Sequence, residues 1–190
     1  MSTPRLSPTS YVVLGMVALR GPSTSYDLKR AVAHSVGYFW PFPHAQLYSE
    51  PKRLVDAGLL DCAVEAGGRR RRTYTITKTG TKELSAWLAE PTNEQMQVRD
   101  IAEMKLFFGE LAEPEDRLTL ARQQVAQHER RIDTYEAMQE RFGEREDVAY
   151  RMVPLRLGLE LEYAALRFWQ RYEHEQEQAG HVKRRKRRRR

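Results

Sequence analysis

The sequence predicts a mainly α-helical protein with one small β-hairpin, divided into two domains. Three features of residues 21–80 indicate the first domain. They are a turn and short helix at Gly21–Arg30, a second helix at His44–Leu54, and two β-like runs flanking Gly67–Arg72. A helix, a turn, a helix and then a hairpin with a cationic tip are the layout of a winged helix-turn-helix. Long apolar periodicity after residue 94 indicates an antiparallel helical second domain.

The first helix is predicted from the apolar stretch Tyr11–Leu19, which has Ser7 as a cap before it and Pro8 in its first turn. Its length alone also suits a buried strand, but the cap and the stop at Gly21–Pro22 favour a helix. A second helix follows from Tyr26 to about Val36. One of three hydroxyl residues caps it: Ser23, Thr24 or Ser25.

Residues 37–43 are aromatic and twice interrupted by proline, which predicts an ordered loop. The next helix runs from His44 to Ala57, and Gly58 suits its C-terminal end. One side carries Leu47, Pro51 and Leu54. The opposite side would face a DNA groove and carries His44, Ala45, Tyr48, Ser49 and Lys52.

A hairpin is predicted where Leu59–Val64 and Thr73–Thr77 alternate on either side of Gly67–Gly68. Another helix then runs from Thr77 to about Ala89, and Pro91–Asn93 is the predicted linker. Residues 1–90 are therefore expected to form the winged helix-turn-helix domain.

Residues 94–177 are expected to form a helical dimerisation domain with helices at Arg99–Leu111, Pro114–Phe142 and Val148–Glu177. The last helix carries two apolar stripes, and so broad an apolar face needs more than one partner. The predicted dimer interface comprises Phe107, Leu118, Val125, Ile132, Tyr135, Leu157, Leu161, Phe168 and Trp169.

Charge divides the chain into three parts. Residues 1–90 carry +5, residues 91–182 carry −7, and residues 183–190 carry +8, so the overall +6 hides a basic first domain and an acidic second one. Residues 178–190 are expected to be a disordered basic tail, because eight like charges cannot fold alone. The tail either adds non-specific DNA affinity, which is favoured, or binds RNA or an acidic surface, or has little consequence.

Several classes of function are disfavoured. No apolar run approaches 18 residues, so no membrane association is expected, and the first residues lack the form of a signal peptide. Cys62 is the single cysteine, which fits a reducing cytoplasm. The five histidines show no metal-ligand spacing, and phosphate-loop and nucleophile motifs are absent. We therefore expect no cofactor, no metal site and no enzymatic activity.

The strongest chemical signal is the run Arg69–Arg72 at the predicted hairpin tip. Guanidinium groups bind phosphate oxygens in paired hydrogen bonds, whereas the simpler interpretation is a solvated turn. Lysine can donate to guanine or phosphate, and tyrosine and serine hydroxyls usually bind phosphate. The predicted DNA-binding residues are Ser25, Tyr26, His44, Gln46, Tyr48, Ser49, Lys52, Arg53, Arg69, Arg70, Arg71, Arg72 and Tyr74.

Three aromatic positions have two interpretations each. Tyr26 either touches DNA or packs under the loop of Phe39 and Trp40. The segment Phe39–Phe42 is either a plug in the core, which is favoured, or the lining of an effector pocket. Trp169 and its neighbours either fill a dimer core, which is favoured, or line an effector cavity.

The chain resembles the PadR family of bacterial transcriptional regulators. The resemblance rests on motifs within residues 7–90, namely Gly21, Ser25–Leu28, Gln46–Tyr48, Lys52–Leu54, Gly58–Leu60, Arg72–Tyr74 and Thr77–Gly80. The region up to about residue 177 resembles the family's helical dimerisation region by pattern and length. Two departures are the basic tail and Pro51, which either kinks the recognition helix or makes it start at Glu50–Pro51.

These observations predict a homodimeric, sequence-specific DNA-binding regulator that binds double-stranded DNA at a near-palindromic operator. The resemblance implies a repressor released by a small-molecule effector or a stress signal. The alternative is a non-specific nucleic-acid-binding protein, architectural or RNA-binding, driven by the wing and the basic tail.

Overall fold

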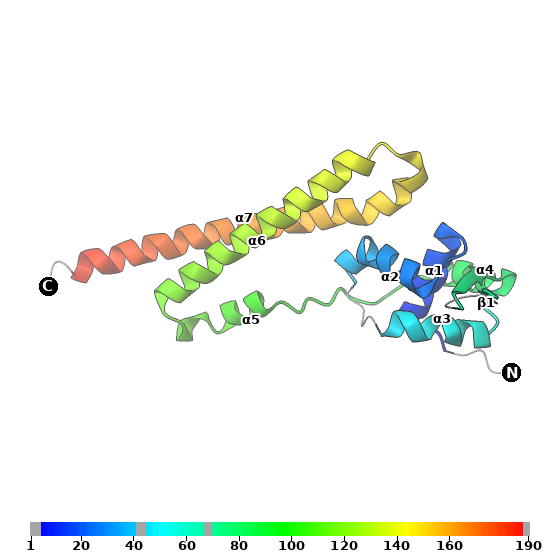
Figure 1. The fold of residues 1–190 in the computed structure, drawn as a ribbon. Helices are drawn as coiled ribbons and strands as arrows, with labels where there is room; N and C mark the ends of the chain where they lie inside the picture. Colours follow the sequence, from blue (N-terminus) through cyan, green and yellow to red (C-terminus); the bar gives the residue numbers. More distant parts are fainter. Residues whose placement is uncertain (1–4, 41–44, 67–69, 188–190) are drawn as a thin grey trace. The chain divides into compact units, whose positions relative to one another are not determined.

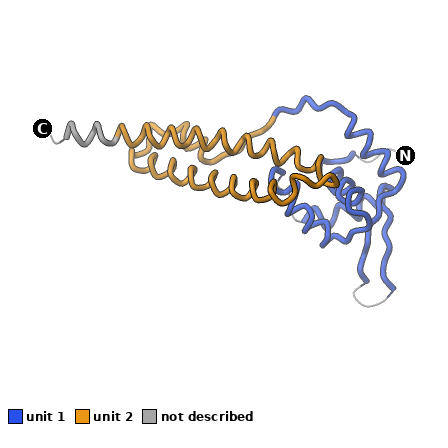
Figure 2. Tube along the Cα trace, turned by 90° about the horizontal axis from the view of Figure 1, so that it is seen from above, with its two compact units in different colours: residues 1–95 blue, residues 96–190 orange. Residues whose placement is uncertain are grey.

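A computed structural model describes the backbone of residues 5–40, 45–66 and 70–187, and side chains as far as residue 179. The chain divides into two compact units, Met1–Gln95 (unit 1) and Met96–Arg190 (unit 2), which are coloured separately in Figure 2. Unit 1 contains α1 (Pro8–Arg20), α2 (Ser25–Ala33), the 3₁₀ turn η1 (Val36–Tyr38), α3 (Gln46–Asp56), β1 (Leu60–Val64), β2 (Arg72–Ile76) and α4 (Lys78–Ala89).

The helices of unit 1 begin and end where local chemistry dictates. Ser7 caps α1 in a reciprocal pair with Ser10, and Thr24 caps α2 in the same way with Asp27. Thr77 caps α4 by accepting from the Gly80 N–H. These caps confirm the predicted starts of all three helices.

Gly58 ends α3 in the left-handed conformation, with φ of 72°. Its N–H donates to the Val55 carbonyl, and the Leu59 N–H donates to the Leu54 carbonyl, which is the Schellman arrangement. The chain then enters β1 directly. This confirms the predicted helix end at Gly58.

Strands β1 and β2 form the predicted antiparallel hairpin, with Leu60 opposite Ile76 and Val64 opposite Arg72. A further bridge joins Ser23, just before α2, to Tyr74 through two backbone hydrogen bonds of 3.0 and 2.9 Å. The hairpin projects from the rest of unit 1 in Figure 2. Its base is therefore fixed to the turn between α1 and α2.

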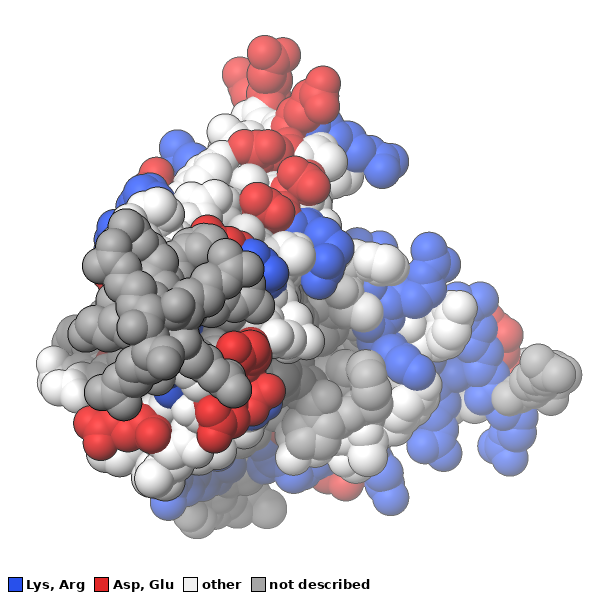
Figure 3. Space-filling model, turned by 90° about the vertical axis from the view of Figure 1, so that its left-hand side faces the viewer, with Lys and Arg blue, Asp and Glu red and all other residues white. Residues whose placement is uncertain are grey.

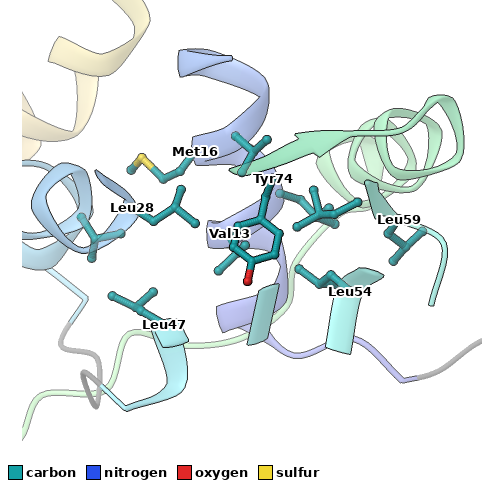
Figure 4. Packing of buried hydrophobic residues seen from close by; sticks show 11 residues of the cluster. Val13, Met16, Leu28, Leu47, Leu54, Leu59 and Tyr74 are labelled. Atoms are coloured by element: carbon teal, nitrogen blue, oxygen red, sulfur yellow. The ribbon is translucent and has the colours of Figure 1, made fainter. Parts of the chain in front are cut away.

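The core of unit 1 draws its buried apolar side chains from α1, α2, α3 and the base of the hairpin (Figure 4), and Leu84 of α4 packs against them. Its most deeply buried side chains include Leu14, Leu28, Leu47, Leu54 and Leu60, each no more than 1% exposed. At roughly 25 cal/mol per Å² of buried apolar surface, this cluster is the main stabilising term of the unit. The core also fixes which face of α3 points outward.

Unit 2 contains α5 (Ile101–Phe107), the 3₁₀ turn η2 (Gly109–Leu111), α6 (Pro114–Phe142), the 3₁₀ turn η3 (Glu146–Val148) and α7 (Ala149–Arg187). Helices α6 and α7 pack side by side and antiparallel (Figure 1). The bounds of α6 match those predicted from Pro114 and Gly143. The mainly α-helical fold class with one hairpin is thus confirmed.

Several predicted bounds differ from the structure, and α3 and α5 each begin two residues later than predicted, at Gln46 and Ile101. Helix α2 stops at Ala33 instead of Val36, and a Cβ on Gly37 would lie 2.7 Å from the Val32 carbonyl, so the chain turns back closely on the helix end. The predicted helix to Leu111 breaks after Phe107, because Gly109 is a poor helix former and begins a 3₁₀ turn. Helix α7 continues to Arg187 rather than ending near Glu177, since glutamine, lysine and arginine favour helix.

Candidate nucleic-acid interface

Helix α3 has one buried and one exposed face. Leu47, Pro51 and Leu54 are buried against the core, each no more than 2% exposed. Tyr48, Ser49 and Lys52 lie on the exposed face, and Tyr48 is 50% exposed. The exposed face therefore offers two hydroxyls and one ammonium group to a ligand.

The helix runs continuously from Gln46 through Pro51, so it does not start at Glu50–Pro51. Proline has no N–H, so the Leu47 carbonyl lacks its usual partner four residues along the helix. Pro51 instead contributes its ring to the core. The exposed residues before Pro51 thus belong to the same helix as Lys52.

The hairpin carries the predicted cationic group. Arg70, Arg71 and Arg72 are exposed, and Arg70 has a positive φ of 46° beside the tip. The Glu65 N–H donates to the Arg71 carbonyl at 3.0 Å, which extends the pairing of the two arms beyond Val64 and Arg72. Lys and Arg side chains gather around this projecting arm at the right of Figure 3.

Arg71 reaches back to α2, where its guanidinium lies 3.5 Å from the Asp27 carboxylate. The Thr24 hydroxyl and N–H donate to the same carboxylate at 2.7 and 3.0 Å. The Thr24 hydrogen bonds, and then Arg71, hold the pKa of Asp27 below its ordinary value. Both ends of the Arg71–Asp27 pair are solvent-exposed, so the pair contributes little stability and leaves Arg71 free to change partners.

Aromatic side chains around α2 are more exposed than predicted. Phe39 is 59% and Trp40 is 44% exposed, so the favoured interpretation of these two as a core plug is wrong. Tyr26 is 61% exposed, and Ser25 is half-buried beside it. The exposed phenol of Tyr26 keeps it a candidate for DNA contact. Pro41 and Phe42 lie outside the described residues.

Tyr74 was predicted to bind DNA, and that prediction is wrong. Its side chain is 4% exposed and lies in the core near Val13 and Leu54 (Figure 4). In a two-stranded hairpin, alternate side chains point to opposite faces, and Tyr74 is on the inner face. Its backbone, through the bridge to Ser23, anchors the hairpin instead.

Two other predicted contacts have partners inside unit 1. The Gln46 side-chain carbonyl accepts from the Thr9 hydroxyl at 3.0 Å, although Gln46 is exposed. Arg53 donates to Glu50 and to the Ser10 hydroxyl. His44 and Arg69, the remaining two members of the predicted DNA-binding set not yet placed, lie outside the described residues.

The residues predicted for a dimer interface fall into three groups in unit 2, which are buried, half-buried and exposed. Ile132, Tyr135 and Trp169 are 4–6% exposed and pack between α6 and α7 of the same chain, so their side chains are not available to a second chain. Leu118 and Val125 are half-buried. By contrast, Phe107 is 82%, Leu157 62%, Leu161 47% and Phe168 42% exposed.

Trp169 fills a core, but it is the core of its own chain rather than that of a dimer. Its ring meets Phe168 and Tyr172 edge-on, with ring centroids 5.4 and 5.9 Å apart. Beside the predicted Phe107, two further apolar side chains are exposed on and after α5, Ile101 at 64% and Leu111 at 86%. Their signal was the dense run of apolar residues between 101 and 111.

Two features are absent from the described part of the chain. None of its helices is both long and apolar enough to cross a membrane. Nowhere in the same residues do three or more histidine, cysteine or acidic side chains gather as metal ligands would.

The helix-turn-helix, its outward α3 face and the arginine-bearing hairpin define a winged helix-turn-helix protein. The PadR-like family of transcriptional regulators matches residues 13–86, and the virulence activator alpha C-terminal family matches residues 98–177. The match to the PadR-like family over the winged helix-turn-helix part of the chain confirms the predicted resemblance.

A curated relative is the negative transcriptional regulator PadR of Bacillus subtilis, 25% identical over 134 residues that span 70% of this chain and 73% of the relative. The crystal structure of Bacillus subtilis PadR with operator DNA matches with a TM-score of 0.79 and 22% identity, covering 90% of this chain and 99% of that one. The same protein with p-coumaric acid matches with a TM-score of 0.74 at 22% identity, covering 91% and 99%.

The Vibrio cholerae virulence activator AphA matches with a TM-score of 0.68 and 23% identity, covering 87% of this chain and 96% of that one. These likenesses extend through both units and show a shared fold. They also show that the helical unit 2 is part of that fold rather than an unrelated addition.

Proposed function

We propose that this protein is a sequence-specific DNA-binding transcriptional regulator rather than an enzyme. The observation that carries the proposal is the pairing, within unit 1, of an exposed polar face on α3 with exposed arginines on the hairpin. An α-helix fits the major groove, and a cationic hairpin beside it suits the adjacent phosphate backbone.

The roles of the exposed groups follow from their chemistry. Lys52 carries a flexible ammonium group that donates to guanine or to phosphate. Tyr48 and Ser49 offer hydroxyls, which mostly bind phosphate and position the helix. Arg70, Arg71 and Arg72 bind phosphates through their planar guanidinium groups.

We further infer that the protein acts as a homodimer through unit 2. Phe107, Leu111 and Leu157 are each more than 60% exposed, which is unusual for large apolar side chains of a self-sufficient domain. In a two-fold dimer, residues 1–90 of each chain would serve as a DNA-binding head and residues 94–177 as the dimerisation domain. Two α3 helices would then meet a near-palindromic operator about one helical turn apart.

The type of regulation is inferred from the relatives. Bacillus subtilis PadR is named a negative regulator and has been crystallised with operator DNA and with p-coumaric acid. We therefore infer a cytoplasmic repressor that a small molecule or a stress signal releases from DNA. A ligand can do this only by binding one arrangement of the two heads better than the other. p-Coumaric acid is the first compound to test for release.

The decisive experiment is selection of bound sequences from a random duplex library. Full-length protein and a version ending at His181 are compared. A shared near-palindrome from both establishes a site-specific regulator and makes the basic tail accessory. An absence of any enriched motif, with binding lost in the shortened version, supports the non-specific nucleic-acid-binding alternative.

The hairpin is tested by replacing Arg70, Arg71 and Arg72 with alanine and measuring affinity over a range of salt concentrations. Log affinity falls with log salt, and each lost phosphate contact reduces the steepness of that fall by about 0.9. We therefore expect weaker binding to every duplex and a shallower salt dependence. Exposed arginines of α7, Arg167 and Arg171, serve as the matched control, because their replacement by alanine should leave the slope unchanged. Unchanged binding after loss of the hairpin arginines would overturn this role.

A further inference from the structure

Arg53 is a basic residue of α3 whose side chain is turned toward α1. One guanidinium nitrogen, Nη2, donates to the Ser10 hydroxyl at 2.8 Å and to Glu50 Oε1 at 2.5 Å, while Nε donates to Glu50 Oε2 at 3.0 Å. The arginine and the carboxylate thus form a two-bond fork, which fixes the orientation of both side chains. These contacts hold the guanidinium against α1 and Glu50, while 40% of the Arg53 side chain stays exposed.

Ser10 is completely buried and belongs to the cap of α1. Its hydroxyl oxygen accepts from the Ser7 N–H at 2.8 Å as well as from Arg53. Arg53 therefore binds a group that the fold of α1 already fixes, rather than a mobile surface hydroxyl.

Glu50 has a side chain only 12% exposed, although it is a charged residue. Burial raises the pKa of its carboxyl group, but the hydrogen bonds from Arg53 and Ser10 outweigh that effect and leave the pKa below its ordinary value. A partly buried carboxylate without such a partner would be costly, so Glu50 and Arg53 depend on each other.

A second polar contact joins the same two helices. The buried Thr9 hydroxyl donates to the Gln46 side-chain carbonyl at 3.0 Å. The first turn of α1 consequently holds α3 at two points, near its start through Gln46 and past its middle through Arg53. Two separated polar contacts thus constrain the direction of α3 in addition to the apolar packing that fixes its outward face.

Pro51 weakens the helix at the point where the Glu50–Arg53 contact is made. It lies between Glu50 and Arg53, and it removes one hydrogen bond from the helix that carries the exposed residues. The Glu50–Arg53 fork spans the proline and links the helix on both sides of it.

We propose that Arg53, acting through Glu50 and Ser10, is a positioning residue that sets the orientation of α3 and thereby its choice of DNA sequence without contacting DNA. The inference rests on the proposed function of α3. It replaces the expectation that Arg53 binds DNA directly, because its guanidinium contacts lie within unit 1.

The test compares Arg53→Lys with Lys52→Gln, its exposed neighbour on the same helix. Lysine keeps the positive charge of Arg53 but cannot form the fork. For Arg53→Lys we expect operator affinity to fall about tenfold, affinity for random duplex to change little, and the salt slope to stay the same. For Lys52→Gln we expect weaker binding to both duplexes and a slope lowered by about 0.9.

Ser10→Ala is the second variant, since it removes the α1 end of the contact without touching the exposed face of α3. It should reproduce the loss of preference for operator at an unchanged salt slope. Arg53→Lys that binds operator like the original protein, or Ser10→Ala that keeps full preference, would overturn the proposal.

A readout without DNA separates this inference from the proposed function. Amide hydrogen exchange of residues 52–56 should speed up about tenfold in Arg53→Lys and in Ser10→Ala, at a temperature where both remain folded. Unchanged exchange would overturn the positioning role. If the original protein prefers no duplex while exchange responds as expected, the DNA-binding proposal fails and the contact between α1 and α3 stands.

Discussion

The two units bury their apolar residues in different ways. In unit 1, a continuous cluster joins α1, α2, α3 and the base of the hairpin around side chains such as Leu14 and Leu54. In unit 2, two small clusters lie along α6 and α7, one around Ala121 and Trp169 and the other around Ile132 and Leu159. The first arrangement resembles a complete domain core, and the second resembles a layer with one side uncovered.

A layer of polar groups lies between the two clusters of unit 2. Glu162 is 7% exposed, forms an ion pair with Arg131 at 3.0 Å, and lies 2.6 Å from His128 Nδ1. His128 Nε2 is also buried and has no hydrogen-bond partner within the described residues. Polar groups of this kind fix the register of two helices at some cost in stability. Unit 1 therefore has one continuous core, whereas unit 2 leaves apolar side chains of α5 and α7 exposed, as the proposed dimer would require.

The largest expected effect is on the core of unit 1. Leu14→Ala should lower the free energy of unfolding of that unit by about 3–5 kcal/mol, because it leaves a cavity at a fully buried position. Thermal and denaturant unfolding measure the loss. Leu19→Ala, on the same helix but 62% exposed, is the control and should change stability by less than about 0.5 kcal/mol. Equal losses from both would contradict a core located on one side of α1.

The next effect concerns the polar layer of unit 2. Glu162→Gln should lower the free energy of unfolding by about 1–3 kcal/mol, since it removes the charge that pairs with Arg131 and His128. Denaturant unfolding of the full chain measures it. The exposed Glu160 on the same helix provides the matched control, Glu160→Gln, with little expected change. If Glu162→Gln instead raised the free energy of unfolding, the polar groups would fix the register of α6 and α7 without stabilising the unit.

A smaller effect should distinguish the exposed apolar surfaces of the two units. Leu157→Ala in α7 should weaken self-association by about tenfold, because the side chain is 62% exposed in one chain and is proposed to be covered by a second. Leu88→Ala in α4, 69% exposed, should leave association unchanged. Sedimentation equilibrium of both variants measures the dissociation constant of the dimer. A monomeric original protein would remove the basis for the homodimer.

The smallest expected effect is a pH dependence in unit 1. The pKa of Glu50 is lowered in the folded state, so its stabilising contribution is present above the unfolded pKa of about 4.3 and is lost as the pH falls through the lower folded value. The difference in stability between the original protein and Glu50→Gln should be under about 1 kcal/mol, constant from pH 5 to 7 and smaller below pH 4. A stability difference that grows as the pH falls would show that the pKa of Glu50 is raised, not lowered, in the folded state.

Local signals explain which parts of the fold were predictable. Helix ends depend on residues close by in the sequence, so they can be predicted from it. Examples are Ser7 and Pro8 at the start of α1, Thr77 at the start of α4 and Gly58 at the end of α3. The apolar sides of α3 and α6 follow from the helical repeat. The exposure of Tyr48, Ser49 and Lys52 followed from the same repeat.

Long-range contacts explain most of what was not predicted. Tyr74 alternates correctly within β2, but alternation does not say which face of a two-stranded hairpin meets the core. The partners of Arg53 include Ser10, a residue 43 positions away. The two apolar stripes of α7 look equivalent in the sequence, and only the packing of α6 shows that Trp169 lies on the inner one. In the proposed dimer, a second chain would cover the other stripe.

Residues 91–100 have no regular secondary structure and are exposed along their whole length. Ten residues can span at most roughly 35 Å, so a short linker joins each head of the proposed dimer to its helical unit. Once one head is bound, the other is confined to a small volume, at an effective concentration on the order of millimolar. A modest affinity for one half-site thus becomes a high avidity for two. This holds only when the two linkers let both heads reach their half-sites at the same time. The length of this segment, as much as the face of α3, would then limit which operators the protein can occupy.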